Sequence, residues 1–346
     1  MHIALFVLCL IIGIVPPVFA LTAIIIGKVK RARALRPVEF YPPRGLSPID
    51  VLMKYYGHRA NTHTLFNPLI LYWADRGFIT IEEDCKRGLK LTKLKSLDPH
   101  FTAYSDSDSA KNYDVEEKLF KDIFANGDVF YSLAAPESYN DATKNFRKSC
   151  NDRRKPMRSA LTKKLSVASF IMSVAFAVIV TLIAALSSGG GPQYLVMIFP
   201  LVGMIAFHAI PNDDIGGVIK YPFFAVWGGA PLIAALVMAP PLAAAALGVS
   251  VLSSAITISL LVDRIDIRTE KDLKIYGEIM GFKRFLLDAE KDRIDTLVEE
   301  NPNYYYDILP YCYILKITEK LKAKFDHISL DGPSWYLGDL RNRLMF

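Results

Sequence analysis

The side chains that could do chemistry in this sequence are few and widely spaced. His58 and His63 lie five residues apart near Asp50, but no third ligand follows at a spacing that would complete a metal site. The patterns H-E-x-x-H, G-x-S-x-G, G-x-G-x-x-G and the P-loop do not occur in the chain. The sequence therefore predicts no catalytic residue, no cofactor and no metal, and we expect that the protein is not an enzyme.

The four cysteines also give no chemical signal. Cys9, Cys85, Cys150 and Cys312 are far apart, and no C-x-x-C spacing is present. Such a pattern indicates neither a zinc site nor a redox pair. We expect unpaired, inert thiols.

One group of titratable residues lies beside a long apolar block. His208 is followed by Asp213 and Asp214, whereas the predicted spans themselves contain no Asp, Glu, Lys or Arg. Transporters usually place ionisable residues inside their spans. We interpret the group as an interfacial polar cluster, and keep an ion or proton site as the alternative.

The apolar residues that surround these groups are concentrated in blocks. The chain has 346 residues, 52% of them hydrophobic, with a mean hydropathy of +0.24. Residues 3–27, 165–212 and 221–262 carry no charge, and "SSGGGPQ" and "APP" divide the last two blocks. About 20 apolar residues cross a bilayer as a helix. The pattern predicts about five transmembrane helices, at 3–27, 165–187, 194–211, 221–239 and 241–262.

The charges of the connecting segments predict the orientation of these helices. Residues 28–164 hold 26 Lys and Arg against 17 Asp and Glu, and Lys and Arg near membrane spans stay on the cytoplasmic side. A cleaved signal peptide is the alternative for the first block, but "MHI" lacks a basic start. We expect a multi-pass protein of the inner membrane, with its amino terminus outside and its carboxyl terminus in the cytoplasm.

Basic clusters flank two of the predicted spans. One follows the first span (Lys28, Lys30, Arg31, Arg33 and Arg36), and the other precedes the second span (Arg153, Arg154 and Lys155). Such clusters anchor a span on the cytoplasmic side and attract anionic phospholipids. These eight residues are the candidate lipid contacts.

The insert between the first two spans, residues 28–164, is expected to fold. Ser47 is a predicted helix N-cap, with Pro48 and Asp50 in the first turn and Gly57 at the end. A second helix is predicted over 61–76, strands at "FITIEED" and "GLKLTKL", and a third helix over 114–126. Helix, helix, hairpin and helix give a winged-helix-like α+β insert.

The tail, residues 263–346, is predicted to be a small helical cytoplasmic domain. It holds 14 Lys and Arg against 16 Asp and Glu, so it could dock electrostatically on the basic insert. One helix is predicted from about 278, ending at Asn301 and Pro302. Its aromatic residues could form a core, a membrane-surface belt or a partner-binding patch; they are Tyr304, Tyr305, Tyr306, Tyr311, Tyr313 and Trp335.

Two blocks of the chain resemble a known family. "YPPRGLSPIDVLMKYYG" and "LFNPLILYWADRGFITIEE" are similar to the YciQ-like bacterial predicted membrane proteins, domain of unknown function 2207. The segment "GEIMGFKRFLLDAEKDRIDTLVEENPNYYYDILPYCYIL", with "KAKF" and "PSWY", resembles the cytoplasmic end of that family. The resemblance implies the family's carboxyl-terminal part without its extracellular β-rich domain, and it implies no catalytic residues.

Three functions remain open from the sequence. The leading hypothesis is a non-enzymatic scaffold or regulatory protein whose two cytoplasmic parts dock and bind a protein partner, with homo-oligomers also considered. The first alternative is a transporter or channel-like protein built from the Gly/Ala-rich spans. The second is a membrane-tethered DNA regulator using the hairpin cations, although helix 61–76 offers few side chains that read bases. The sequence therefore does not favour nucleic acid as a partner.

Overall fold

The computed structural model describes residues 2–57, 60–84, 86–97, 107–132, 136–154, 159–187, 189, 191–195, 198–209, 222, 225–328 and 332–337. They are mostly helical and include one small sheet. The chain divides into two compact units. Unit 1 consists of Met1–Ala32 and Ser159–Arg268, and unit 2 consists of Arg33–Arg158 and Thr269–Phe346.

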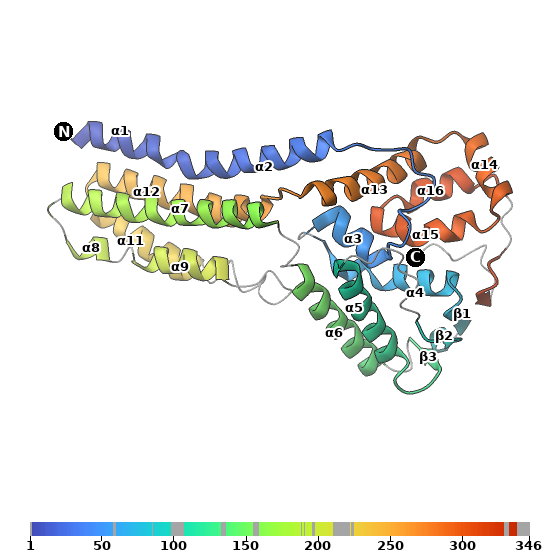
Figure 1. The fold of residues 1–346 in the computed structure, drawn as a ribbon. Helices are drawn as coiled ribbons and strands as arrows, with labels where there is room; N and C mark the ends of the chain where they lie inside the picture. The colour runs from blue at the N-terminus through green and yellow to red at the C-terminus, as the bar shows by residue number, and fades with distance from the viewer. Residues whose placement is uncertain are drawn as a thin grey trace. The chain divides into compact units, whose positions relative to one another are not determined.

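Unit 1 is helical throughout its described elements. These are α1 (His2–Gly13), α2 (Val15–Arg33), α7 (Ala160–Ser187), α8 (Pro192–Leu195), α9 (Ile198–Ala209), a π-helical turn (Ala225–Gly229), α11 (Ala230–Met238), α12 (Pro241–Ile256), a second π-helical turn (Thr257–Leu261) and a 3-10 turn (Val262–Arg264). Figure 1 shows α7 and α12 side by side.

Two of the described helical stretches are long and apolar enough to cross a membrane. They are Val7–Arg33 and Ala160–Ser187, while Pro241–Ile256 is apolar but shorter. In the other predicted spans, 194–211 and 221–239, the described residues include the short helices α9 and α11. Gly228, Gly229 and Pro231 disfavour a regular helix, and a π-helical turn precedes α11 there. The structure therefore does not confirm the five-span prediction.

Small hydroxyl side chains join the helices of unit 1. Ser254 donates a 2.9 Å hydrogen bond to the carbonyl oxygen of Ser173 on α7, and Ser253 donates one of 2.5 Å to that of Gly13 on α1. Small residues let helix backbones approach closely, which is how helices associate in an apolar environment. The Gly-, Ala- and Ser-rich composition of these segments thus serves helix packing.

Unit 2 combines helices with short strands. Its described elements are α3 (Pro48–Tyr56), a 3-10 turn (Thr62–Thr64), α4 (Phe66–Asp75), β1 (Ile79–Asp84), β2 (Gly88–Lys93), α5 (Ser107–Ile123), β3 (Val129–Tyr131), α6 (Pro136–Arg154), α13 (Glu270–Asp288), α14 (Lys291–Glu300), α15 (Tyr304–Leu315), α16 (Thr318–Phe325) and β4 (Tyr336–Leu337).

Local sequence signals account for the beginning of this unit. Ser47 caps α3 reciprocally with Asp50, since each side chain accepts a hydrogen bond from the other residue's backbone N–H. Gly77 takes a positive φ of 70° and ends α4. The predicted hairpin forms as β1 and β2, with Ile81 opposite Leu91.

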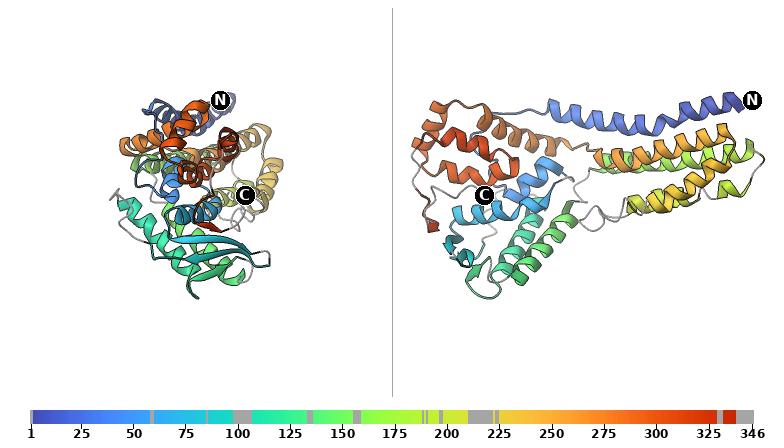
Figure 2. Two further views of the ribbon diagram at one scale, coloured as in Figure 1. Left: turned by 90° about the vertical axis from the view of Figure 1, so that its right-hand side faces the viewer. Right: turned by 180° about the vertical axis from the view of Figure 1, so that it is seen from behind.

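The sheet contains strands from both segments of unit 2. Its order is β3-β2-β1-β4 (Figure 2), and β4 of the tail pairs parallel to β1, with Tyr336 opposite Ile81. The prediction of a winged-helix-like insert treated residues 28–164 as a separate fold. That prediction is not confirmed, because residues beyond the insert supply one of the four strands.

A single hydrophobic core joins the two segments of unit 2. Ile49, Leu69 and Trp73 of the insert share it with Tyr304 and Tyr311 of the tail. Among the described residues, an ion pair also joins the two segments, between the buried Lys54 and the 31% exposed Asp272, at 3.2 Å. The segments therefore pack mainly through apolar burial, and electrostatic attraction is a minor part of their contact.

The burial of the aromatic residues of the tail shows that our interpretation of them as a partner-binding patch was wrong. Tyr304 is fully buried, Tyr313 is partly buried, and the others are at most 9% exposed: Tyr305, Tyr306, Tyr311 and Trp335. Rings that fill a core cannot also form an exposed surface. Of the three interpretations left open, the core of a helical domain fits these positions.

Three helix boundaries differ from the sequence prediction. Helix α5 begins at Ser107 and not at 114, so part of the expected polar loop is helical. Thr269 caps α13, which therefore begins well before 278, with Asp272 in its first turn. Residues 62–64 form a 3-10 turn, and α4 begins only at Phe66.

Candidate functional site

A polar pocket of about 430 Å³ lies within unit 2. Its lining comes from three places in the chain: the segment 41–46, the end of α4 and the middle of α15. The lining residues are Tyr41, Pro42, Pro43, Arg44, Gly45, Leu46, Tyr72, Arg76, Asp307 and Tyr311. The pocket therefore presents two guanidinium groups, a carboxylate and three tyrosine rings to one space.

The backbone of segment 41–46 is held against α15. Two prolines restrict φ in this segment, and Gly45 adopts a positive φ of 75°. The hydroxyl of Tyr311 donates a 2.8 Å hydrogen bond to the carbonyl oxygen of Leu46. The rings of Tyr72 and Tyr311 meet edge to face, 6.2 Å between centroids. The wall of the pocket is thus fixed by both backbone and aromatic contacts.

The charged groups of the pocket are connected to one another. The guanidinium of Arg76 lies 5.5 Å from the ring centroid of Tyr72 and 3.9 Å from a carboxylate oxygen of Asp75. Asp75 is hydrogen-bonded to Asp307, which also accepts a 2.8 Å bond from the side-chain amide of Asn301. Asp75 and Asp307 therefore form a carboxyl pair behind Arg76.

This carboxyl pair holds a proton more tightly than isolated carboxylates do. Burial raises the pKa of Asp75 well above its ordinary value, and the negative charge of Asp307 raises it further. Two carboxyl groups within hydrogen-bond distance share a proton because both cannot ionise cheaply. The carboxyl pair can therefore bind a cationic group of a ligand, and the neighbouring guanidinium of Arg76 can bind an anionic group.

A second polar cluster is buried beside α4, and its residues are not part of the pocket lining. The indole Nε1–H of Trp73 donates a 2.7 Å hydrogen bond to Glu116, and Asn112 donates one of 2.8 Å to Asp50. Burial raises the pKa of Glu116 to about 7. These partners satisfy the buried groups, so the cluster supports the structure of unit 2.

The basic residues predicted to meet lipid have different surroundings. Lys28, Lys30, Arg33 and Arg36 are exposed. The prediction of a lipid contact is wrong for Arg31. Its guanidinium donates to a carboxylate oxygen of Asp266 at 2.7 Å and is largely buried. Arg153 and Arg154 end α6, and Lys155 lies outside the described residues.

The other two candidate sites receive little support. His208 lies in α9, and Asp213 and Asp214 fall outside the described residues, so that ion site stays a prediction. On the hairpin, Lys90 pairs with Glu82 at 2.7 Å and Arg87 lies over the ring of Tyr131. These cations have partners inside unit 2, which does not favour DNA binding.

Sequence reasoning missed Asp75, Arg76 and Asp307. A signal was nevertheless present, because Asp75 and Arg76 are the only charged residues between Ala60 and Thr80. Asp307 is likewise the only charged residue from 301 to 315. A charged group inside a strongly apolar run is costly to bury unless it has a partner, so it indicates a polar site.

The two units together define a membrane protein with an α+β globular part. Unit 1 supplies the two apolar helical stretches, and unit 2 carries the polar pocket. The chain belongs to the family described as predicted membrane protein (DUF2207), C-terminal domain, whose sequence model matches residues 37–325. The resemblance found in the sequence is thereby confirmed. Neither the comparison with curated proteins nor the one with solved structures found a match.

Proposed function

We propose that this chain is a multi-pass inner-membrane protein whose unit 2 is a non-enzymatic regulatory or scaffolding domain that binds a protein partner in the cytoplasm. The observation that carries the proposal is the pocket formed by segment 41–46, α4 and α15. Tyr41, Arg44 and Arg76 are exposed there, beside Asp307. A binding surface with fixed tyrosine rings and both charges suits a short charged peptide segment.

The proposal includes a topology of five spans, with the amino terminus outside and the carboxyl terminus inside. The excess of Lys and Arg in residues 28–164 supports it. In this topology both segments of unit 2 lie on the same side of the membrane, as a shared core requires. The winged-helix-like order of α3, α4, the β1–β2 hairpin and α5 then belongs to a larger domain that the tail completes.

Cysteine accessibility in intact cells and inverted vesicles tests this topology. The native thiols Cys9, Cys150 and Cys312 are buried and make poor probes. Single cysteines at Lys86 and Glu299, both exposed in unit 2, should react only from the cytoplasmic side. Cysteines at Leu186 and Met238 lie beside the dividing segments "SSGGGPQ" and "APP", which the five-span topology places outside, and should react only from outside. Labelling of Lys86→Cys from outside would overturn the topology.

Site-specific photo-crosslinking in cells tests partner binding. A photoreactive phenylalanine in place of Tyr41 should form a discrete adduct with one protein, because Tyr41 stands at the rim of the pocket. Arg76→Gln and Asp307→Asn should each abolish that adduct, whereas Arg87→Gln, on the hairpin, should leave it intact. An adduct that is indifferent to Arg76 and Asp307 would refute the assigned site.

A further inference from the structure

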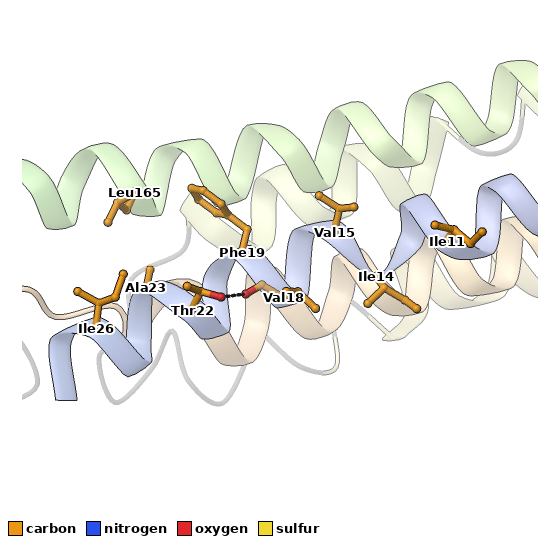
Figure 3. A pocket seen from close by; sticks show the side chains of 9 residues that line it. All are labelled: Ile11, Ile14, Val15, Val18, Phe19, Thr22, Ala23, Ile26 and Leu165. Atoms are coloured by element: carbon orange, nitrogen blue, oxygen red, sulfur yellow. Dashed lines mark hydrogen bonds between the residues drawn. The ribbon is translucent and has the colours of Figure 1, made fainter. Parts of the chain in front are cut away.

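An apolar groove runs along the first membrane segment of unit 1 (Figure 3). Its volume is about 570 Å³. All but one of the lining residues come from the first segment, and Leu165 of α7 completes the wall: Ile11, Ile14, Val15, Val18, Phe19, Thr22, Ala23, Ile26 and Leu165. The hydroxyl of Thr22 donates to the carbonyl oxygen of Val18, so even this polar side chain offers no unpaired group.

The groove follows from the sequence of this segment. The helix is interrupted at Ile14, where α1 ends and α2 begins. Pro16 and Pro17 have no N–H to donate, which allows them in the first turn of α2 but not within one continuous helix. Further along, the short side chains of Thr22 and Ala23 leave room between Phe19 and Ile26 (Figure 3).

The groove is long enough to hold one extended acyl chain. Residues 11 to 26 rise about 22 Å along a helix at 1.5 Å per residue. One leaflet contributes about 15 Å to the hydrocarbon core. An acyl chain of one leaflet that lies along the helix would fill about two thirds of the groove.

A basic end continues the groove on the same helix face. Lys30 follows Ile26 by four residues, which places it on the groove side of α2, and it is exposed. Lys164 is exposed next to Leu165, at the start of α7. The neighbouring acid Asp266 is occupied by Arg31 at 2.7 Å and Arg268 at 3.4 Å. The end of the groove therefore carries positive charge.

We propose that this groove is a binding site for one anionic phospholipid, with an acyl chain along α1 and α2 and its headgroup at Lys30. A second helix is a poorer occupant. Helices associate through small residues, whereas the groove is lined largely by branched Ile and Val side chains, which a flexible chain follows more readily. A parallel second copy would also bring its own Lys30 to the same basic end.

Lipid binding by the purified full chain tests the site. Native mass spectrometry should show one phosphatidylglycerol retained more strongly than phosphatidylcholine with the same acyl chains. Lys30→Gln should weaken retention of phosphatidylglycerol about fivefold, the effect of one basic residue near an anionic headgroup. Lys28→Gln is the matched control, since Lys28 is also exposed but lies on another face of α2. Thr22→Leu should reduce binding of both lipids by filling the groove, since Thr22 lines it and is exposed.

Two results would overturn the proposal. The first is that the Lys30→Gln and Lys28→Gln variants, both melting at the wild-type temperature, retain phosphatidylglycerol equally well. The second is efficient disulfide formation between copies through Val18→Cys, which would show that a second chain occupies the groove. The proposal does not rest on the pocket of unit 2, so the loss of either site would leave the other standing.

Discussion

The hydroxyl of Tyr311 donates a 2.8 Å hydrogen bond to the carbonyl oxygen of Leu46, a residue 265 positions earlier in the chain. Tyr304 makes a similar 2.6 Å bond to the carbonyl oxygen of Phe40. Through these two bonds, helix α15 fixes the segment that follows the first membrane helix. The tyrosines of the tail therefore act as hydrogen-bond donors in addition to filling the core.

Tyr311→Phe should lower the free energy of unfolding by about 1–2 kcal/mol, because the carbonyl of Leu46 loses its partner in a buried place. Thermal unfolding of the full chain in mild detergent measures the change. Tyr305→Phe is the control: its ring is buried on the same helix, and its hydroxyl makes no hydrogen bond to segment 40–46 among the described residues. Equal losses from both substitutions would show that the hydroxyl of Tyr311 has no special role.

Gly277→Ala and Gly281→Ala should each destabilise unit 2 by about 1–3 kcal/mol or more, the usual cost of overpacking. An added Cβ at these positions would collide with the carbonyl oxygens of Leu35 and Pro37, respectively, which lie directly on α13. The melting temperature of each variant measures the effect. Gly248→Ala on α12 meets only the end of Leu236 at 3.8 Å and should be tolerated. If it proved as harmful as Gly277→Ala, close approach of the backbone would not be the cause.

Glu116→Gln should make the stability of the protein less dependent on pH. The pKa of Glu116 is raised from 4.5 to about 7 in the folded chain, chiefly by burial. The folded state thus binds the proton more tightly than the unfolded state does, so this contribution is complete below about pH 4.5 and is lost as pH rises through about 7. Gln keeps an acceptor for the indole N–H of Trp73 and never ionises.

Melting curves between about pH 5 and pH 8 check this prediction. The wild type should lose stability over that range relative to Glu116→Gln, by about 3 kcal/mol at most, since one pKa unit corresponds to about 1.4 kcal/mol. Glu117→Gln, one residue further along α5, is the matched control because Glu117 is more exposed and pairs with Lys121. Parallel curves for wild type and Glu116→Gln would contradict the assignment.

Asp266→Asn should destabilise unit 1 by about 3 kcal/mol or more, because it leaves the largely buried guanidinium of Arg31 without its counter-charge. Asp288→Asn breaks the pair with Arg284, whose side chains are 69% and 65% exposed. Exposed pairs of this kind contribute little to stability. Proteolysis of the solubilised chain at increasing temperature distinguishes the two, and a similar response from both variants would argue against a structural role for Asp266.

Much of unit 2 was predictable because its signals are local. The capping residues Ser47 and Asp50, the alternation of the β1 and β2 strands, and the terminating Gly77 depend on neighbours in sequence. Predicted helix boundaries were wrong where the sequence contained two competing signals for the start of a helix. Asp114 and Glu117 resemble a capping box, but helix α5 already runs through them from Ser107.

The pocket and the shared core were harder to predict because they depend on contacts across the whole chain. Nothing near Tyr311 indicates that Leu46 is its partner, and nothing near Asp75 indicates Asp307. Periodicity identified the aromatic residues of the tail but not the surface they bury against. The same limit applies to β4, whose two residues form a strand only because β1 offers a free edge.

The two segments of unit 2 have a consequence for biosynthesis. Residues 33–158 leave the ribosome after α1 and α2 but before residues 159–268 of unit 1, and residues 269–337 leave last. Until then the first segment lacks α13, α15 and β4. Ile49, Leu69 and Trp73 are then without their packing partners from the tail, and one edge of β1 is unpaired. Exposed apolar surface and free strand edges promote aggregation. We expect the nascent chain to need a holding chaperone until the last helices of unit 2 are made.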